Sequence, residues 1–122
     1  MPVRLLNSSV FKWPDAASVD RAVRQWAEKV NREREGILRI GYFGSYAKGN
    51  WGVGSDLDLV IIVKSSELPF HRRAIEWDTM ELPVPTDVVV YTEAEWQRLD
   101  QQTKFFKMLK EETIWVFIQV NN

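Results

Sequence analysis

Apolar residues recur at three- and four-residue steps across residues 18–35, the spacing of one face of an amphipathic helix. Asp15 or Ser18 supplies a start signal for this helix, and Gly36 supplies a stop signal. The pattern therefore predicts an N-terminal helix within residues 15–35. Its apolar positions are Val19, Ala22, Val23, Trp26, Ala27 and Val30.

Four shorter apolar runs have the length and composition of β-strands. The second run is rich in β-branched residues and almost continuously apolar, which indicates a central strand that is covered on both faces. The runs cover residues 37–43, 57–63, 86–91 and 113–120.

Three further helices are predicted between these strands. Ser65 or Ser66 can cap a helix over residues 67–78, with Pro69 restricted to its first turn. Thr92 opens a T-x-x-E capping box, which predicts a helix to about residue 99, and residues 103–112 form the last helix. Strands and helices alternate with short links, so we predict a sheet with helices packed against it.

Length and composition limit the possible classes of protein. The chain has 122 residues, of which 45% are hydrophobic, so we expect one domain over residues 1–122. Its 16 basic and 17 acidic residues give a net charge of -1 without a basic stripe, so long nucleic acid is not an expected partner. There is no cysteine, which excludes thiolate chemistry, and no apolar run of membrane-spanning length. We expect a cytoplasmic protein with no membrane contact.

The candidate chemistry lies between residues 42 and 63. Asp56 and Asp58 stand where the second strand leaves a glycine-rich loop, and their spacing places both carboxylates on one face. Burying two acids at a strand is costly unless a cation lies between them. Gly44 and Ser45 end the preceding strand, in a turn that suits a phosphate chain. We therefore expect a divalent cation that carries a phosphorylated ligand.

A third acid, Asp87, lies one residue inside the third strand. If that strand neighbours the second one, three carboxylates meet at one sheet edge, as suits Mg²⁺. Two ions there would clamp the entering and leaving oxygens of a phosphoryl displacement, and Asp87 could help to deprotonate the attacking hydroxyl. Lys48 could add a positive charge against a triphosphate.

Each of these residues also has a simpler interpretation. Asp56 and Asp58 could end a solvated loop, and Asp87 could be a turn residue after two prolines. Ser45 could merely cap the following turn, a role that is compatible with holding phosphate. Trp51 is expected to cover the edge of the core. Residues 71–73 (His-Arg-Arg) are expected to form an exposed helix face.

The motif residues together resemble the DNA polymerase beta-type nucleotidyltransferase superfamily. The pattern is a strand, G-S-x-A-[RK]-G, then S-D-x-D-[LI] and an apolar strand, with a third acid on a later strand. Lys48 stands where these proteins commonly have arginine. The matching residues are Gly44, Ser45, Ala47, Lys48, Gly49, Ser55, Asp56, Asp58, Leu59 and Asp87.

Within that superfamily the short chain resembles the minimal nucleotidyltransferases, antitoxin-type partners of HEPN-domain proteins. The resemblance implies an α+β fold, a mixed β-sheet flanked by α-helices, with a catalytic core at 37–91 and closing helices and strand at 92–120. It implies that Asp56, Asp58 and Asp87 hold two Mg²⁺ ions, and that ATP is bound by Gly44, Ser45, Lys48 and Ser55.

The activity implied is transfer of AMP from ATP to a hydroxyl, by analogy a tyrosine of a HEPN-type toxin in a hetero-oligomer. Two alternatives remain open at this point. One is a binding antitoxin that neutralises its partner by contact, against which the three intact acids argue. The other is transfer to a small molecule such as an aminoglycoside, against which the absence of an acceptor domain argues.

Overall fold

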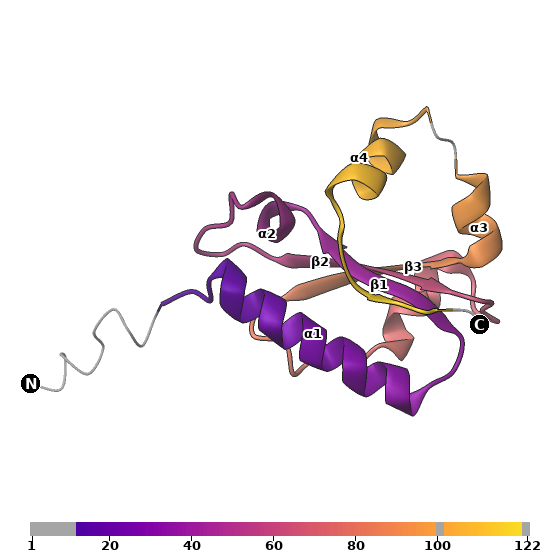
Figure 1. Cartoon of the computed structure of the whole chain (residues 1–122), viewed down its shortest axis with the longest axis horizontal. Helices are drawn as coiled ribbons and strands as arrows, with labels where there is room; N and C mark the ends of the chain where they lie inside the picture. Colours follow the sequence, from indigo (N-terminus) through magenta and orange to yellow (C-terminus); the bar gives the residue numbers. More distant parts are fainter. Residues whose placement is uncertain (1–11, 100–101, 121–122) are drawn as a thin grey trace, which may run out of the picture.

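The computed structural model describes residues 12–99 and 102–120, which are built around one four-stranded sheet (Figure 1). The strand order is β3-β2-β1-β4; β2 and β3 are parallel, and β1 pairs antiparallel with β2 and β4. The expected α+β fold with a mixed sheet is confirmed. The strands are β1 (Ile37–Phe43), β2 (Leu57–Val63), β3 (Thr86–Thr92) and β4 (Ile114–Ile118).

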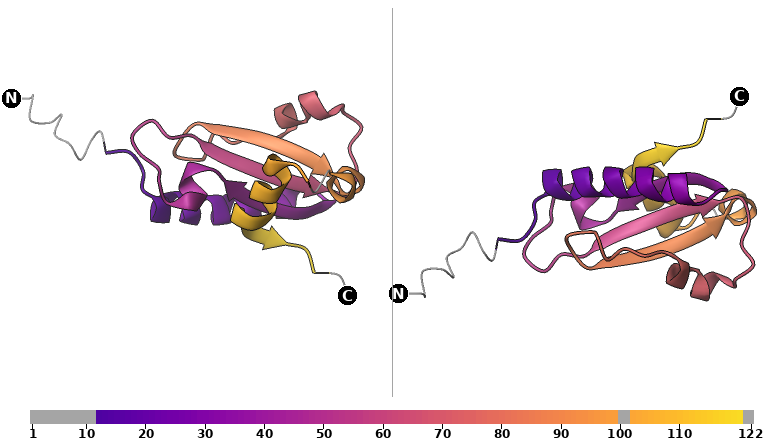
Figure 2. Two further views of the ribbon diagram at one scale, coloured as in Figure 1. Left: turned by 90° about the horizontal axis from the view of Figure 1, so that it is seen from above. Right: turned by 90° about the horizontal axis from the view of Figure 1, so that it is seen from below.

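Helices cover both faces of the sheet. The long helix α1 packs on one face, and the shorter α3 and α4 lie on the other (Figures 1 and 2). A single turn, α2, follows β1. No helix in the described part of the chain is long and apolar enough to cross a bilayer. The bounds are α1 (Ala16–Glu33), α2 (Ser45–Lys48), the 3₁₀ helix η2 (Phe70–Glu76), α3 (Glu93–Arg98) and α4 (Lys104–Glu112).

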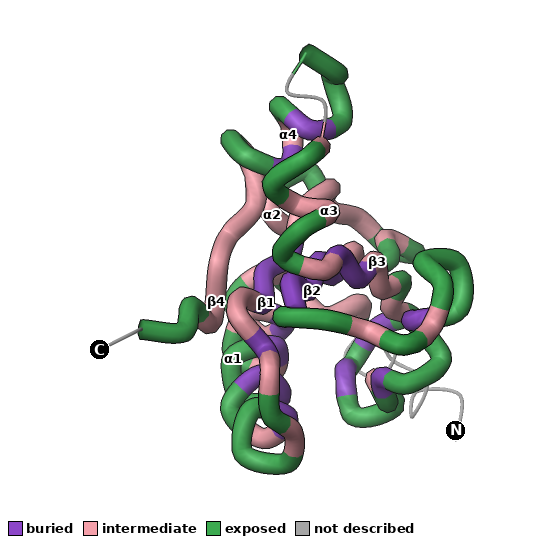
Figure 3. The backbone as a smooth tube through the Cα atoms, turned by 90° about the vertical axis from the view of Figure 1, so that its right-hand side faces the viewer, coloured by how far each residue is buried: buried purple, intermediate pink, exposed green. Residues whose placement is uncertain are grey.

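Strand β2 is central and buried on both faces, as its sequence predicts. Leu59 and Ile61 belong to the apolar cluster on the α1 side, whereas Val60 and Ile62 belong to the cluster beneath α3 and α4. All four are at most 2% exposed, and buried segments concentrate along the middle of the sheet (Figure 3). Even-numbered side chains of β2 therefore point to the α3 and α4 side, which includes Asp58.

Side-chain caps begin three helices: Asp15 and Thr92 were predicted as caps, whereas Thr103 was predicted only as the first residue of the last helix. The Asp15 carboxylate accepts a hydrogen bond from Ser18 N–H, Thr92 and Glu95 form the full capping box, and Thr103 Oγ1 accepts from Phe106 N–H. Each cap satisfies an amide that the helix itself cannot. The starts of α1, α3 and α4 therefore agree with the sequence prediction to within one residue. The far ends are less accurate, since α1 ends at Glu33 and β4 at Ile118.

The helix predicted over residues 67–78 with a Ser65 or Ser66 cap is wrong in type, length and start. Only the 3₁₀ helix η2 forms there, with Pro69 at its N-cap and no side-chain cap. The prediction that residues 71–73 form an exposed helix face is also wrong at Arg73, which is 6% exposed. Arg73 donates to the carbonyls of Leu68 and Val90 and makes a bidentate pair with Glu95 at 2.6 and 3.0 Å. A tight 3₁₀ turn after an extended Pro69 directs this side chain inward, where it joins η2, β3 and α3.

Candidate functional site

Asp58 and Asp87 lie side by side at the start of the parallel strands β2 and β3. Their Cα atoms are register partners, so the two strands place them about 4.8 Å apart, with both side chains on the face that carries α3 and α4. Asp56 lies just before β2. Asp58 is half-buried, whereas Asp56 and Asp87 are exposed. The sheet topology therefore brings the second and third predicted acids together.

The electrostatics of Asp58 show that all three acids are close enough to interact. Burial raises the pKa of Asp58 above its usual value, and the negative charges of Asp87 and then Asp56 raise that pKa further. None of the ion pairs found within residues 12–99 and 102–120 involves these three carboxylates. The site thus holds negative charge that no described cation neutralises.

Asp56, Asp58 and Asp87 fit a divalent metal ion by their charge and by the oxygen ligands that they offer. As positioned, no three Asp, Glu, His or Cys side chains of the described residues converge closely enough to hold an ion. Asp56 and Asp87 are exposed, so both can change rotamer without disturbing the core. Uncompensated carboxylates are the oxygen ligands that Mg²⁺ prefers, and a cation would relieve their repulsion.

Gly44 presses its backbone against this acid cluster. It has φ 79° and ψ -153°, a conformation that is almost restricted to glycine. A Cβ atom at this position would overlap Asp58 Oδ2. The carbonyl of Gly44 accepts from the Ala47 and Lys48 amides, both at 3.0 Å. The N–H groups of Ser45 and Tyr46, at the start of α2, have no acceptor within the turn.

Gly44→Ala is expected to damage both fold and site. The backbone conformation alone costs about 1–3 kcal/mol for a non-glycine residue, and the new methyl group would push Asp58 away. Gly49→Ala is the matched control, because Gly49 also has a positive φ (85°) but no atom lies within 4 Å of its added Cβ. Urea unfolding should show the larger loss for Gly44→Ala, and equal losses would contradict both the close contact and the strained backbone assigned to Gly44.

Two predicted binding residues have other contacts in this structure. Ser55 Oγ accepts from Gly52 N–H at 2.8 Å and Ser55 N–H donates to Gly52 O, so this residue closes the glycine-rich loop. Lys48 Nζ lies 3.6 Å from Glu112 Oε1, at the end of α4. Trp51 stacks on Tyr46 with ring centroids 5.7 Å apart, and it covers the core edge as predicted.

Helix α4 contributes neighbours that sequence reasoning did not assign to the site. Phe105, 47% exposed, contacts Phe43 edge-on, with ring centroids 6.1 Å apart. Phe43 lies on β1 and is the register partner of Asp58. The sequence does contain a signal for an exposed aromatic side chain on this helix. Phe105 and Phe106 are adjacent, so their side chains point in different directions around the helix axis. The contact of Phe105 with Phe43, next to Asp58, is made only by the tertiary packing of α4 on the sheet.

The chain belongs to the nucleotidyltransferase domain family, whose model matches residues 23–116. Its fold is similar to that of a protein from Sulfolobus solfataricus proposed to be a nucleotidyltransferase, with TM-score 0.61 and 16% identity over 85% of this chain and 84% of that one. It is also similar to a chain from a toxin–antitoxin structure with AMP-PNP, with TM-score 0.55 and 16% identity over 79% and 73%. No curated protein sequence matches the chain significantly.

Proposed function

We propose that this nucleotidyltransferase depends on Mg²⁺ and transfers AMP from ATP to a hydroxyl group, with release of pyrophosphate. One observation carries the proposal: Asp58 lies in register with Asp87 and directly against the backbone of Gly44. Nucleotidyl transfer requires acidic metal ligands and a phosphate-binding turn, and the acids and the turn that we propose for these two parts are adjacent.

Each residue then has a distinct role. Asp56, Asp58 and Asp87 would hold two Mg²⁺ ions, which supply positive charge against the triphosphate when bound. Asp87, exposed at the sheet edge, accepts the proton of the attacking hydroxyl. The hydroxyl oxygen bonds to the α-phosphorus, and the bond from that phosphorus to the β-phosphate bridging oxygen breaks. Gly44 and Ser45 hold the triphosphate through backbone N–H groups and the Ser45 hydroxyl.

The acceptor we propose is a tyrosine of a HEPN-type toxin that associates with this chain, which then acts as an antitoxin. Asp56 and Asp87 are exposed to solvent, so a macromolecule can present a side chain to them. Every strand of the described residues belongs to the one sheet and the helices pack against it, so these elements form no separate acceptor-binding unit. The similar toxin–antitoxin structure with AMP-PNP adds weight to this choice.

Mass spectrometry of a co-expressed HEPN-type protein tests the proposal. After incubation with ATP and Mg²⁺, the partner should gain one adenylyl group with wild-type protein and none with Asp87→Asn. Glu28→Gln is the control, since Glu28 is an exposed acid on α1, on the opposite face. A partner that stays unmodified but is bound and silenced equally by wild type and Asp87→Asn would favour neutralisation by contact. Modification of an aminoglycoside alone would favour the small-molecule alternative.

A further inference from the structure

Glu112 is an unusual residue for its position in α4. Phe105, Leu109 and Glu112 occupy one stripe of this helix, at steps of four and three residues, and Leu109 is fully buried. Glu112 is also the last residue of the helix, where a negative charge opposes the helix dipole. Neither the apolar stripe nor the C-terminal end of the helix favours a carboxylate. Packing and helix stability therefore give no reason for a glutamate at this position.

The carboxylate of Glu112 is also poorly satisfied. The side chain is 38% exposed, yet its Oε1 atom is shielded from solvent and accepts no hydrogen bond from the described residues. A buried carboxylate oxygen without a donor is energetically unfavourable. Lys48 Nζ, at 3.6 Å, is the one cation that forms an ion pair with it among residues 12–99 and 102–120.

This ion pair leaves Lys48 available to another partner. At 3.6 Å the ammonium is too far from Glu112 for a hydrogen bond, so its donors are not used there. Both side chains are more than a third exposed, and an ion pair of this kind is weak and easily exchanged. A triphosphate carries several negative charges, so it attracts the same ammonium more strongly than one carboxylate does.

The two partners come from elements that border the acid cluster. Lys48 ends the turn α2, whose N-cap residue is Gly44 beside Asp58. Glu112 ends α4, whose first turn carries Phe105 against Phe43, the register partner of Asp58. A change in the partner of Lys48 therefore occurs where α2 and α4 meet, next to the proposed nucleotide.

We propose that Glu112 is a positioning residue that competes with nucleotide for Lys48. This inference rests on the proposed function: Glu112 holds the Lys48 ammonium in the nucleotide-free protein and gives it up to the triphosphate when ATP binds. Part of the binding energy of the triphosphate is used to break the ion pair. Glu112 thereby lowers nucleotide affinity. Loss of the ion pair also loosens the junction of α4 with α2 when nucleotide is bound.

Calorimetric titration of MgATP into four proteins tests this competition. Glu112→Gln should bind two- to fivefold more tightly than wild type, equivalent to roughly 0.4–1 kcal/mol. Lys48→Met should bind more weakly, and the double variant should match Lys48→Met, because Glu112 acts only through Lys48. An unchanged or weaker affinity for Glu112→Gln, or the same tightening without Lys48, would overturn the inference.

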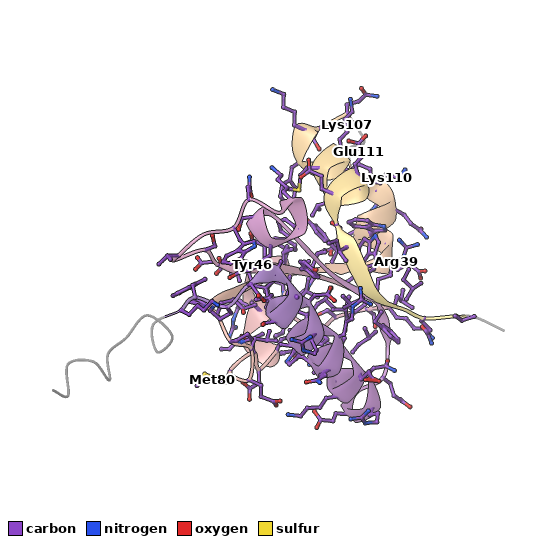
Figure 4. All side chains as sticks on the ribbon, turned by 60° about the vertical axis from the view of Figure 1, so that its left-hand side comes forward. Arg39, Tyr46, Met80, Lys107, Lys110 and Glu111 are labelled. Carbon is purple, nitrogen blue, oxygen red and sulfur yellow. The ribbon has the colours of Figure 1, made fainter. Side chains whose placement is uncertain are left out.

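Glu111→Gln is the matched control. It changes net charge by the same amount one residue earlier, and Glu111 is exposed on α4 together with Lys107 and Lys110 (Figure 4). Equal tightening in Glu111→Gln would show a general charge effect and would also overturn the inference. Wild-type protein that binds no MgATP would remove the proposed function and this inference together, whereas normal binding without a Glu112 effect removes the inference alone.

A second measurement follows the ion pair itself, first without nucleotide and then with it. Urea unfolding of wild type, Lys48→Met, Glu112→Gln and the double variant, all without ATP, gives the coupling between the two side chains. A favourable coupling that disappears in saturating MgATP is the expected result. Coupling that persists unchanged with MgATP bound would mean that Lys48 stays with Glu112, and the competition would be disproved.

Discussion

Asp58→Asn is expected to abolish nucleotidyl transfer while it makes the folded protein more stable at neutral pH. Activity should fall on the order of 10³-fold or more, because loss of a metal-binding carboxylate removes several kcal/mol of transition-state stabilisation. Stability should rise because Asp58 is half-buried beside Asp56 and Asp87, and the neutral amide no longer meets their repulsion. Adenylyl transfer and the urea midpoint at pH 7 measure the two effects.

The pH dependence of stability has a definite sign at this residue. The pKa of Asp58 is raised in the folded protein, by burial first and by Asp87 and Asp56 next. An acid with a raised folded pKa destabilises the fold where it is ionised, and this penalty disappears as the pH falls through the raised value. The stability advantage of Asp58→Asn over wild type should therefore shrink on acidification.

Magnesium supplies the control for this prediction. Mg²⁺ with ATP should raise the unfolding midpoint of wild type and not that of Asp58→Asn, because only wild type keeps the full set of carboxylates. Glu28→Gln, an exposed change on α1, should behave like wild type in every assay. Full activity in Asp58→Asn, or a lower midpoint at pH 7, would refute our interpretation of this acid.

Glu95→Ala is expected to cause the largest loss of stability, about 2–4 kcal/mol. Arg73 is 6% exposed, and Glu95 holds its guanidinium through two hydrogen bonds. Removing one partner of a buried ion pair strands the other charge, which typically costs about 3–5 kcal/mol, and the partial exposure of Glu95 reduces that figure. The same carboxylate accepts from Thr92 N–H at 2.9 Å, so the capping box of α3 is lost as well.

Urea unfolding of single and double variants isolates the ion pair. Arg73→Met with Glu95→Ala should be more stable than the sum of the two single losses predicts, because no charge is then left unpaired. Glu93→Ala is a suitable control, since Glu93 lies in the same helical turn but is exposed. Losses for Glu95→Ala no greater than for Glu93→Ala would show that Arg73 does not depend on its partner.

Acidification should weaken the ion pair between Arg73 and Glu95 only at low pH. The hydrogen bond from Arg73 is the main cause that lowers the pKa of Glu95 from 4.5 to about 2. A lowered folded pKa gives stability that is complete above the unfolded value and is lost as the pH falls toward about 2. Wild type should therefore lose more stability than Glu95→Gln between pH 5 and pH 2. Parallel curves for the two proteins would contradict the assigned cause.

Local sequence patterns were sufficient for much of the fold. The period of the apolar residues placed α1 and all four strands, and capping residues such as Asp15 and Thr92 marked where helices begin. These features depend on neighbours three or four residues away, which a sequence displays directly. The segment around Arg73 failed because a buried charge is satisfied by distant groups, here Val90 O and Glu95.

The sequence by itself determined the four strands and the helices α1, α3 and α4. It also showed the family motifs around Gly44 and Asp58, and it identified Asp87 as a candidate third acid. Only the tertiary structure decided that β2 and β3 are parallel neighbours, which sets Asp58 beside Asp87, and that Lys48 meets Glu112. The physical reason is that strand order and helix packing depend on burial across the whole sheet. Such contacts join residues that are far apart in the chain, so no local pattern encodes them.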